Sequence, residues 1–214
     1  MQLEIKAIKK EAGGVFSLLF SKPENFIFYP GQYLDIGRIL SISSSPTEDF
    51  VMLTYKTGIS SFKKMLEKVK IGDLFSSSHP AGTVVMDNSS PIVMIAGGIG
   101  ITPHRSMIKW AVDSKADLPI TLIYSNSDED FIFKEELDEW VKQYPKLKIH
   151  YMVTSKDGHL TKEKLRSIIN FPLSIINSIF YLAGPPSLVD DFENILLSLG
   201  IDETSIRTDR FDGL

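Results

Sequence analysis

The sequence predicts a two-domain protein of the β + α/β class, in which an antiparallel β-barrel is followed by a doubly wound parallel sheet. Up to about Asp87, short alternating runs of apolar residues are separated by glycine and proline turns, as in antiparallel sheets. From Pro91 onward, apolar runs alternate with helical patterns, which favours a parallel sheet with helices on both faces. The segment between them is polar and turn-forming, so we expect domains at residues 1–88 and 89–214.

The first domain is expected to consist of short strands and one helix. The helix is expected over residues 60–69, because Phe62, Met65, Leu66 and Val69 recur at helical spacing. The expected strands cover residues 3–8, 15–20, 32–36, 40–44 and 51–55. Short strands joined by turns at this spacing are typical of a barrel or a sandwich.

The second domain begins with Ile92–Ala96, a continuous apolar run that is typical of a strand buried on both faces. Helical patterns then separate three further strand-like runs. The expected strands are 92–96, 120–124, 147–153 and 179–182, and the expected helices are 103–112, 134–144, 161–169 and 187–199.

Composition narrows the classes of function. The chain has 214 residues, a net charge of −4 and no cysteine, which excludes disulfides, Cys nucleophiles and Cys-ligated metal or iron–sulfur sites within it. Charge near balance disfavours nucleic-acid binding, and the four histidines are too scattered to predict a metal site. The N-terminus alternates like a strand, and no apolar run approaches the ~18 residues that span a bilayer. We therefore expect a cytoplasmic protein without membrane insertion.

A glycine-rich segment follows the first strand of the second domain. Ile92–Ala96 runs into Gly97, Gly98 and Gly100 before Thr102-Pro103. Glycines lack Cβ, so the backbone can turn sharply and a ligand can approach it closely. We expect Thr102 to be the N-cap and Pro103 the first residue of a helix whose N-terminus favours a pyrophosphate.

Two other segments carry candidate binding groups. In the first domain, Pro30–Tyr33 is followed by Arg38, whose planar donor fork can bind a phosphate, and by small donors at Ser41 and 43–45. In the second domain, the last predicted strand runs into Ala-Gly-Pro-Pro at 183–186. The carboxyl ends of strands in a doubly wound sheet face the ligand crevice.

In this order and spacing, the segments resemble the ferredoxin-NADP reductase superfamily over essentially the whole chain, in a two-domain form without an iron–sulfur domain. Gly97–Pro103 is similar to the nicotinamide-pyrophosphate loop, and Arg38–Ser41 to the flavin motif Arg-x-Tyr-Ser/Thr. Gly58–Ser61 resembles the loop that binds flavin phosphate, His79–Gly82 the turn that closes the barrel, and Ala183–Pro186 the Cys-Gly-Pro-Pro segment.

The chain departs from that family pattern in three places. Leu40 replaces a Tyr that packs on the flavin, and Ala183 replaces a Cys near the hydride path. Where relatives end in an aromatic residue that shields the flavin ring, this chain ends Arg210-Phe-Asp-Gly-Leu214, so Phe211 is the candidate for that role.

The resemblance implies FAD in a six-stranded barrel, with FMN as the alternative, and NAD(P)H in the second domain. It implies that Ser41 hydrogen-bonds near flavin N5 and is the candidate catalytic residue. The implied flavin-binding residues are Arg38, Leu40, Ser41, Tyr55 and Lys56 through their backbones, Ser60 and Ser61. The implied dinucleotide-binding residues are Gly97, Gly98, Gly100, Ile101, Thr102, Pro103, Ser125, Asn126, Gly184, Pro185 and Pro186.

The implied function is a flavin-dependent oxidoreductase that transfers hydride between NAD(P)H and flavin and single electrons to or from a ferredoxin or cytochrome. Three alternatives stay open. They are a reductase of small diffusible acceptors such as free flavin, quinones or metal chelates, the electron-transfer subunit of a larger complex, and a non-catalytic dinucleotide-binding module.

Two charged segments bear on the coenzyme and the partner. After the strand 120–124, the loop Ser125–Asp130 carries three consecutive acids and no basic residue before Lys134. It therefore favours NADH over NADPH, although Ser125, Ser127 and Lys134 leave NADPH open. Lysines cluster in and after the helix of the first domain, where they form either a docking surface for an acidic partner or a solvated helix face. They are Lys63, Lys64, Lys68 and Lys70.

Overall fold

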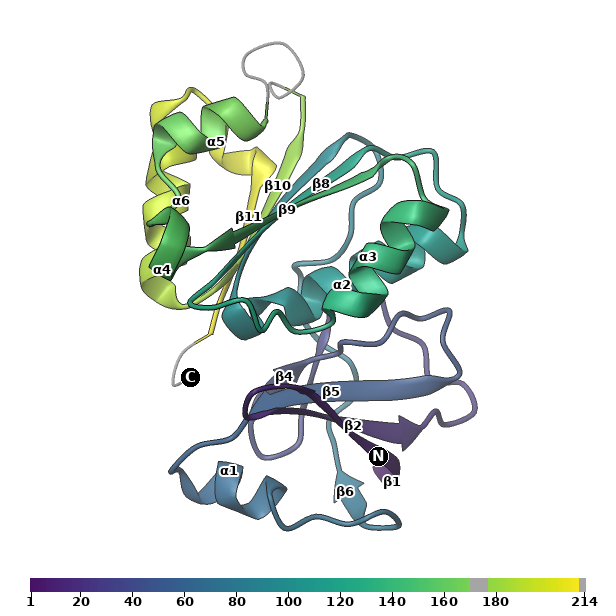
Figure 1. Ribbon diagram of the computed structural model, residues 1–214. Helices are drawn as coiled ribbons and strands as arrows, with labels where there is room; N and C mark the ends of the chain where they lie inside the picture. Colours follow the sequence, from purple (N-terminus) through teal and green to yellow (C-terminus); the bar gives the residue numbers. More distant parts are fainter. Residues whose placement is uncertain (170–176, 212–214) are drawn as a thin grey trace. The chain divides into compact units, whose positions relative to one another are not determined.

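The computed structural model describes residues 1–169 and 177–211, which fall into two compact units (Figure 1). Met1–Met86 and Thr102–Asp113 form the first unit, and Asp87–Ile101 and Ser114–Leu214 form the second. Helix α2 (Ile101–Asp113) therefore belongs almost wholly to the first unit, although its sequence lies between strands of the second.

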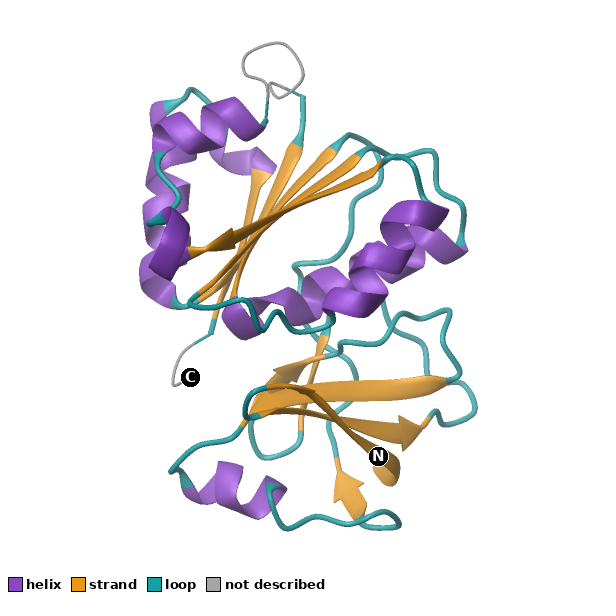
Figure 2. Cartoon of the chain, viewed as in Figure 1, coloured by secondary structure: helices purple, strands orange, loops and turns teal. Residues whose placement is uncertain are grey.

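The strands of the first unit, which Figure 2 shows in orange, pair antiparallel. Its main sheet has the order β5-β2-β1-β6, and β3 and β4 form a separate two-stranded ribbon. The strands are β1 (Gln2–Ala12), β2 (Val15–Ser21), β3 (Tyr33–Asp35), β4 (Ile39–Ser41), β5 (Phe50–Lys56) and β6 (Leu74–Ser76), and the helix is α1 (Ser61–Leu66). Isolated bridges join Tyr33 to Ala81 and Ile42 to Leu53. The predicted barrel class is confirmed as an antiparallel half-barrel.

The core of the first unit follows from the period-two pattern of its strands. Leu3 and Ile5 on β1, and Leu18 and Phe20 on β2, are fully buried on one face of the sheet. Leu53 on β5 joins the same cluster. Alternate residues of a strand point to opposite faces, so this spacing brings one apolar face of each strand to a common core.

The second unit contains a five-stranded sheet of order β11-β10-β7-β8-β9, and each neighbouring pair is parallel. The strands are β7 (Ile92–Gly97), β8 (Ile120–Asn126), β9 (Leu147–Val153), β10 (Ile179–Gly184) and β11 (Ile206–Arg210). The helical elements are η1 (Gly98–Gly100), α3 (Lys134–Gln143), α4 (Thr154–Asp157), α5 (Lys162–Ile168), α6 (Pro186–Ser198) and η2 (Glu203–Ser205). The predicted doubly wound parallel sheet is confirmed.

Helices cover both faces of this sheet: α3 lies on one face, and α5 and α6 lie on the other (Figure 1). All residues of β7 and β10 are buried, as expected for central strands of such a sheet. From β7 the chain adds strands first on the β8 side and then on the β10 side. Ligands bind outside the carboxyl ends of the strands at such a reversal, here between β7 and β10.

Two expectations about the elements are wrong. Thr102 is not an N-cap and Pro103 is not the first helical residue, because α2 begins at Ile101 and follows directly on the turn η1. The strands β6 and β11 were not predicted. Both lie at sheet edges. β6 has three residues and β11 is polar at four of its five positions, so neither sequence shows the alternation that marks a half-buried strand.

Among the described residues, the longest helices are α2 and α6 with 13 residues each, and none is long and apolar enough to cross a bilayer.

Candidate functional site

Two turns meet at the carboxyl ends of β7 and β10. A Cβ placed on Gly100 would lie 2.5 Å from the carbonyl carbon of Ala183 and 2.7 Å from the Cα of Gly184, both backbone atoms. A Cβ on Gly184 would lie 3.1 Å from the carbonyl oxygen of Gly97. The glycine-rich segment and the Ala-Gly-Pro-Pro segment therefore pack backbone against backbone. At Gly100 the glycine is required by the neighbouring strand.

Gly98 occupies the open side of this turn. Its φ is +53°, and a Cβ added there would meet only Asn126 Oδ1, at 4.0 Å. The Gly98 carbonyl accepts a hydrogen bond from the Tyr124 hydroxyl at 2.9 Å. Tyr124 is fully buried, and burial raises the pKa of its phenol, so the hydroxyl stays a donor. Sequence reasoning missed Tyr124, although a tyrosine near the end of an aliphatic strand was a visible signal.

Ser125 and Asn126 lie beside this turn, as their place at the end of β8 predicts. Ser125 is paired with Gly97 across the β7–β8 ladder. The amide nitrogen of Asn126 donates to the carbonyls of Asp128 and Asp130 at 3.3 and 3.2 Å. Asn126 thus folds the acidic loop back on itself. The side-chain NH2 group of Asn126 is therefore hydrogen-bonded within the loop, whereas its Oδ1 lies near Gly98.

A lysine that the sequence reasoning missed neutralises part of the acidic loop. Lys156 on α4 forms an ion pair with Glu129 at 2.5 Å, and the hydrogen bond that its ammonium group donates to the Glu129 carboxylate raises the pKa of Lys156. Lys134, which could have reached back to the loop, pairs with Asp138 at 2.5 Å and lies 4.4 Å from the centre of the Tyr151 ring. Lys156 is therefore the basic group that the fold brings to this loop.

The remaining predicted dinucleotide residues differ in exposure. Ile101, Thr102 and Pro103 are buried at the start of α2, whereas Pro185 is exposed and Pro186 is the first residue of α6. After β11, the backbone N–H of Phe211 donates to the Gly184 carbonyl at 2.9 Å. The aromatic residue near the chain end is thereby held beside the β10 turn. Residues 212–214 of the same segment lie outside the described residues.

The predicted flavin motif Arg38–Ser41 lies just before the point at which the chain is bridged to β5. The two strands belong to separate sheets and are joined by the bridge Ile42–Leu53, next to which the Ser43 N–H donates to the Met52 carbonyl at 2.8 Å. Before this bridge, β4 pairs with β3 alone among the described residues. On the Ser41 side of the bridge, residues 39–41 of β4 and residues 54–56 of β5 therefore do not pair with each other.

Within that region the side chains suit an anionic, partly apolar ligand. Arg38 is exposed, and no described residue forms an ion pair or hydrogen bond with its guanidinium. Leu40 is half-buried, and Ser41 is 8% exposed. The four residues from Arg38 to Ser41 thus present a free guanidinium, an apolar side chain and a small hydroxyl, in that order.

Tyr55 and Ser60 already have structural partners. The Tyr55 hydroxyl donates to the Leu66 carbonyl at 3.0 Å, and burial raises the pKa of this phenol. Its side chain is therefore part of the core of the first unit, and along one edge of β5 Tyr55 and the exposed Lys56 are paired with Phe16 and Val15 of β2. The Ser60 hydroxyl caps α1 by accepting from the Lys63 N–H at 3.3 Å, and Ser61 is exposed beside it.

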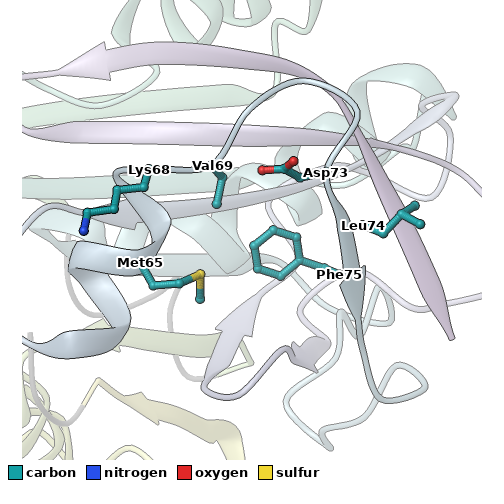
Figure 3. A pocket seen from close by; sticks show the side chains of 6 residues that line it. All are labelled: Met65, Lys68, Val69, Asp73, Leu74 and Phe75. Carbon is teal, nitrogen blue, oxygen red and sulfur yellow. The ribbon is translucent and has the colours of Figure 1, made fainter.

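A hollow of about 400 Å³ lies elsewhere on the first unit, between α1 and β6 (Figure 3). Its lining residues are Met65, Lys68, Val69, Asp73, Leu74 and Phe75. Lys68, one of the clustered lysines, lines it, but none of the predicted flavin-binding or dinucleotide-binding residues does. The Asp73 carboxylate accepts from the Lys70 N–H at 2.8 Å, so this acid is held by its own turn.

Comparison with known proteins yields matches over both units. The family of oxidoreductase NAD-binding domains matches residues 94–194. Flavohemoprotein A of Dictyostelium discoideum is 28% identical over 235 residues, covering 96% of this chain and 58% of that protein. NADH-cytochrome b5 reductase 1 of Mortierella alpina is 27% identical over 197 residues, covering 82% of this chain and 65% of that protein.

Solved structures resemble this chain closely in fold even where few residues are identical. Ferredoxin-NADP+ reductase from Plasmodium falciparum superimposes with a TM-score of 0.86 at 20% identity, covering 98% of this chain and 95% of that one. The chain spans about 58% to 65% of the length of the two curated relatives. At these identities the structural match establishes a shared two-part fold.

Proposed function

We propose that this chain, which belongs to the ferredoxin-NADP reductase-like family, is an NAD(P)H-dependent flavoprotein reductase that passes electrons to a one-electron carrier protein. Residues 1–88 would hold the flavin and residues 89–214 the dinucleotide. The proposal rests above all on the backbone packing of the Gly97–Gly100 turn against Gly184. That packing builds a close glycine turn at the strand reversal where doubly wound sheets bind nucleotides.

The residues present fit a flavin. The free guanidinium of Arg38 would bind a flavin phosphate, because its planar fork donates to two phosphate oxygens at once. The Ser60 and Ser61 hydroxyls at the start of α1 would add donors. Leu40 would pack on the ring, and the backbones of Tyr55 and Lys56 would meet its polar edge.

Ser41 is the proposed catalytic residue. Its side chain is almost buried, so a hydrogen bond from its hydroxyl to flavin N5 would be shielded from water and stronger than an exposed one. When bound, FAD, or FMN as the alternative, would supply the chemistry that takes up hydride from reduced nicotinamide and passes electrons on singly. The protein supplies the position of the reacting groups and the local field.

The dinucleotide would lie along the carboxyl ends of β7, β8 and β10. The N–H groups at Gly98–Gly100 would face the pyrophosphate, because the turn passes directly into α2 and carries its positive dipole end. Thr102 and Pro103 would shape the turn from within, whereas Ser125 and Asn126 would meet the ribose side. Gly184–Pro186 and Phe211 would lie near the nicotinamide.

We propose NADH as the preferred coenzyme. Asp128 and Asp130 in the loop after β8 would repel a 2′-phosphate and suit a free 2′-hydroxyl. Lys156 reduces this repulsion, because it neutralises Glu129, so we expect a moderate preference. The ratio of kcat/KM for NADH and NADPH with ferricyanide as acceptor measures it. A tenfold advantage for NADPH, which is about 1.4 kcal/mol, would contradict it.

The names of the relatives support a one-electron partner: a flavohemoprotein, a cytochrome b5 reductase and a ferredoxin-NADP+ reductase. These 214 residues contain no cysteine, so a Cys-ligated cluster in the pathway would lie outside them. We therefore propose a ferredoxin or a cytochrome as the partner.

The deciding experiment is a visible spectrum of the purified protein after incubation with FAD or FMN, recorded before and after anaerobic addition of NADH. We expect absorbance near ~450 nm that bleaches with NADH. A protein that takes up neither flavin at micromolar concentration would refute the proposal. Rapid reduction of free flavin or quinones, without transfer to any ferredoxin or cytochrome, would assign it instead to reductases of diffusible acceptors.

A further inference from the structure

A buried ion pair joins α2 to the turn between β4 and β5 in the first unit. The Arg105 side chain is 2% exposed and that of Glu48 is 11% exposed. Arg105 Nη1 donates to Glu48 Oε2 at 3.0 Å, and Nη2 donates to Oε1 at 3.2 Å. Taking two charges out of water is costly, and an apolar pair often stabilises a fold as well. Stability alone therefore does not account for charged residues here.

The ion pair also fixes the backbone of the turn. Arg105 Nη1 donates to the Ser43 carbonyl at 2.8 Å, and the Ser106 hydroxyl donates to the Ser44 carbonyl at 2.6 Å. The Glu48 carboxylate accepts from the Ser45 N–H at 2.6 Å. The three consecutive, fully buried serines 43–45 are thus held by Arg105 and Ser106 of α2 and by Glu48, the ion-pair partner of Arg105.

This anchored turn begins two residues after Ser41. Between them, the Ile42 N–H donates to the Gln32 carbonyl at 2.8 Å, and Ile42 forms the bridge to Leu53. On the Ser41 side of that bridge, β4 and β5 belong to separate sheets. Ser41 itself pairs with Tyr33 of β3, so the link from this two-stranded ribbon to β5 runs through the Ile42–Leu53 bridge and the anchored turn that follows it.

We propose that Arg105 is a positioning residue that sets the placement of Ser41 through Ser43 and Glu48. The proposal rests on the proposed function, because it takes Ser41 as the residue that hydrogen-bonds the flavin. A planar fork is needed to span a carboxylate and a carbonyl oxygen together, and the ammonium group of lysine does not reproduce it. Arg105→Lys therefore keeps the charge and removes the geometry.

The test compares Arg105→Lys and Glu48→Gln with Thr47→Val. Thr47 lies on the same turn, and its hydroxyl donates to Asp113 at 2.5 Å and lies 2.7 Å from the Ser45 hydroxyl. Thr47→Val therefore removes side-chain hydrogen bonds of this turn while leaving both members of the Arg105–Glu48 ion pair in place. Anaerobic stopped-flow gives the rate of flavin reduction by NADH. Because small misplacements slow a reaction steeply, we expect the first two variants to lose about ten- to a hundredfold in this rate, with the NADH dissociation constant within about threefold of wild type. Thr47→Val should match wild type.

A double-mutant cycle separates positioning from general damage. Once Ser41→Ala has removed the hydroxyl, adding Arg105→Lys should cost less than about threefold more, because both changes act on one interaction. Losses that multiply would overturn the proposal. If Arg105→Lys does not fold, Glu48→Gln takes its place in the cycle, since it keeps the shape of the side chain and an acceptor.

Hydrogen exchange of the amides of residues 41–48 in the flavin-free protein gives a readout independent of activity. We expect loss of protection in Arg105→Lys and none in Thr47→Val. Unchanged protection in both, or lost protection with a wild-type rate of flavin reduction, would overturn the positioning role. A wild-type protein that binds no flavin fails the proposed function itself, which is seen before any variant is compared.

Discussion

Replacement of Gly100 by alanine tests the backbone packing at the candidate dinucleotide site. The φ of Gly100 lies outside the left-handed region, so an alanine fits the local conformation. Without a clash, Gly100→Ala would stabilise the protein by roughly 0.4–1 kcal/mol, because it restricts the unfolded chain. With the packing described above, the new Cβ would lie 2.5 Å from a backbone carbon of Ala183, where ordinary contacts begin at 3.4 Å.

The two backbones would therefore have to separate by about 1 Å, and neither is a flexible side chain. Overpacking of this kind costs about 1–3 kcal/mol. The structure therefore predicts that Gly100→Ala lowers the free energy of unfolding, whereas the effect on the unfolded chain alone would raise it. In a chain of this size each kcal/mol lowers the Tm by about 2–4 °C. We also expect weaker NADH binding, because the glycine turn and the β10 turn are pushed apart.

The assay is thermal and urea unfolding, together with NADH titration, of Gly100→Ala and two controls. Gly200→Ala, with φ at +81° and nothing within 4 Å, measures left-handed strain alone, at about 1–2 kcal/mol. Gly98→Ala carries similar strain but meets open space, so it should weaken NADH binding more than its loss of stability explains. A Gly100→Ala protein with an unchanged or raised Tm would refute the packing argument.

Four further predictions follow from the site and the core. Arg38→Ala should weaken flavin binding by about 1.5–3 kcal/mol, the range for hydrogen bonds to charged groups, and unchanged affinity in a flavin titration would remove Arg38 from the site. Tyr124→Phe should lower the free energy of unfolding by about 0.5–1.5 kcal/mol and raise the KM for NADH, because the glycine turn loses its buried donor; unaltered urea unfolding and KM would contradict this. Burial lowers the pKa of His104 to about 3, so between about pH 6.5 and 3 the unfolded chain binds a proton that the folded protein does not. The free energy of unfolding should therefore fall as the pH drops through this range. His104→Met should flatten that slope when urea unfolding is measured at several pH values. Charge reversal at Lys63 and Lys64 should slow association with an acidic carrier at low salt and flatten its salt dependence, whereas rates equal to wild type would leave these lysines as a solvated helix face.

The candidate site was predictable where the residue type itself carries the chemistry. The run of glycines after an apolar strand, Arg38 near a serine, and Ala-Gly-Pro-Pro after the last buried strand are all local signals. They were sufficient for the resemblance and for the fold class, because period two and continuous apolar runs depend on neighbouring residues only. The edge strand β6 lacked such a signal, since its three residues are too few to show a period.

Other contributors were invisible because their roles depend on distant residues. Tyr124 acts through a carbonyl 26 positions away, and Lys156 meets Glu129 across 27 positions, after two different strands. Arg105 reaches a turn 57 residues earlier in the chain. No local pattern distinguishes these side chains from an ordinary core tyrosine or an ordinary surface charge.

The sequence by itself determined the order of a barrel and a parallel sheet, the absence of thiol chemistry and the glycine turns at strand ends, because each depends on residue type and local spacing. Only the tertiary structure decided why Gly100 must be glycine and what holds the serines after Ser41. Those answers depend on which backbone lies against which. Strand order is set by burial of the whole sheet, and it brought β10 beside β7 although about 80 residues separate them in the chain.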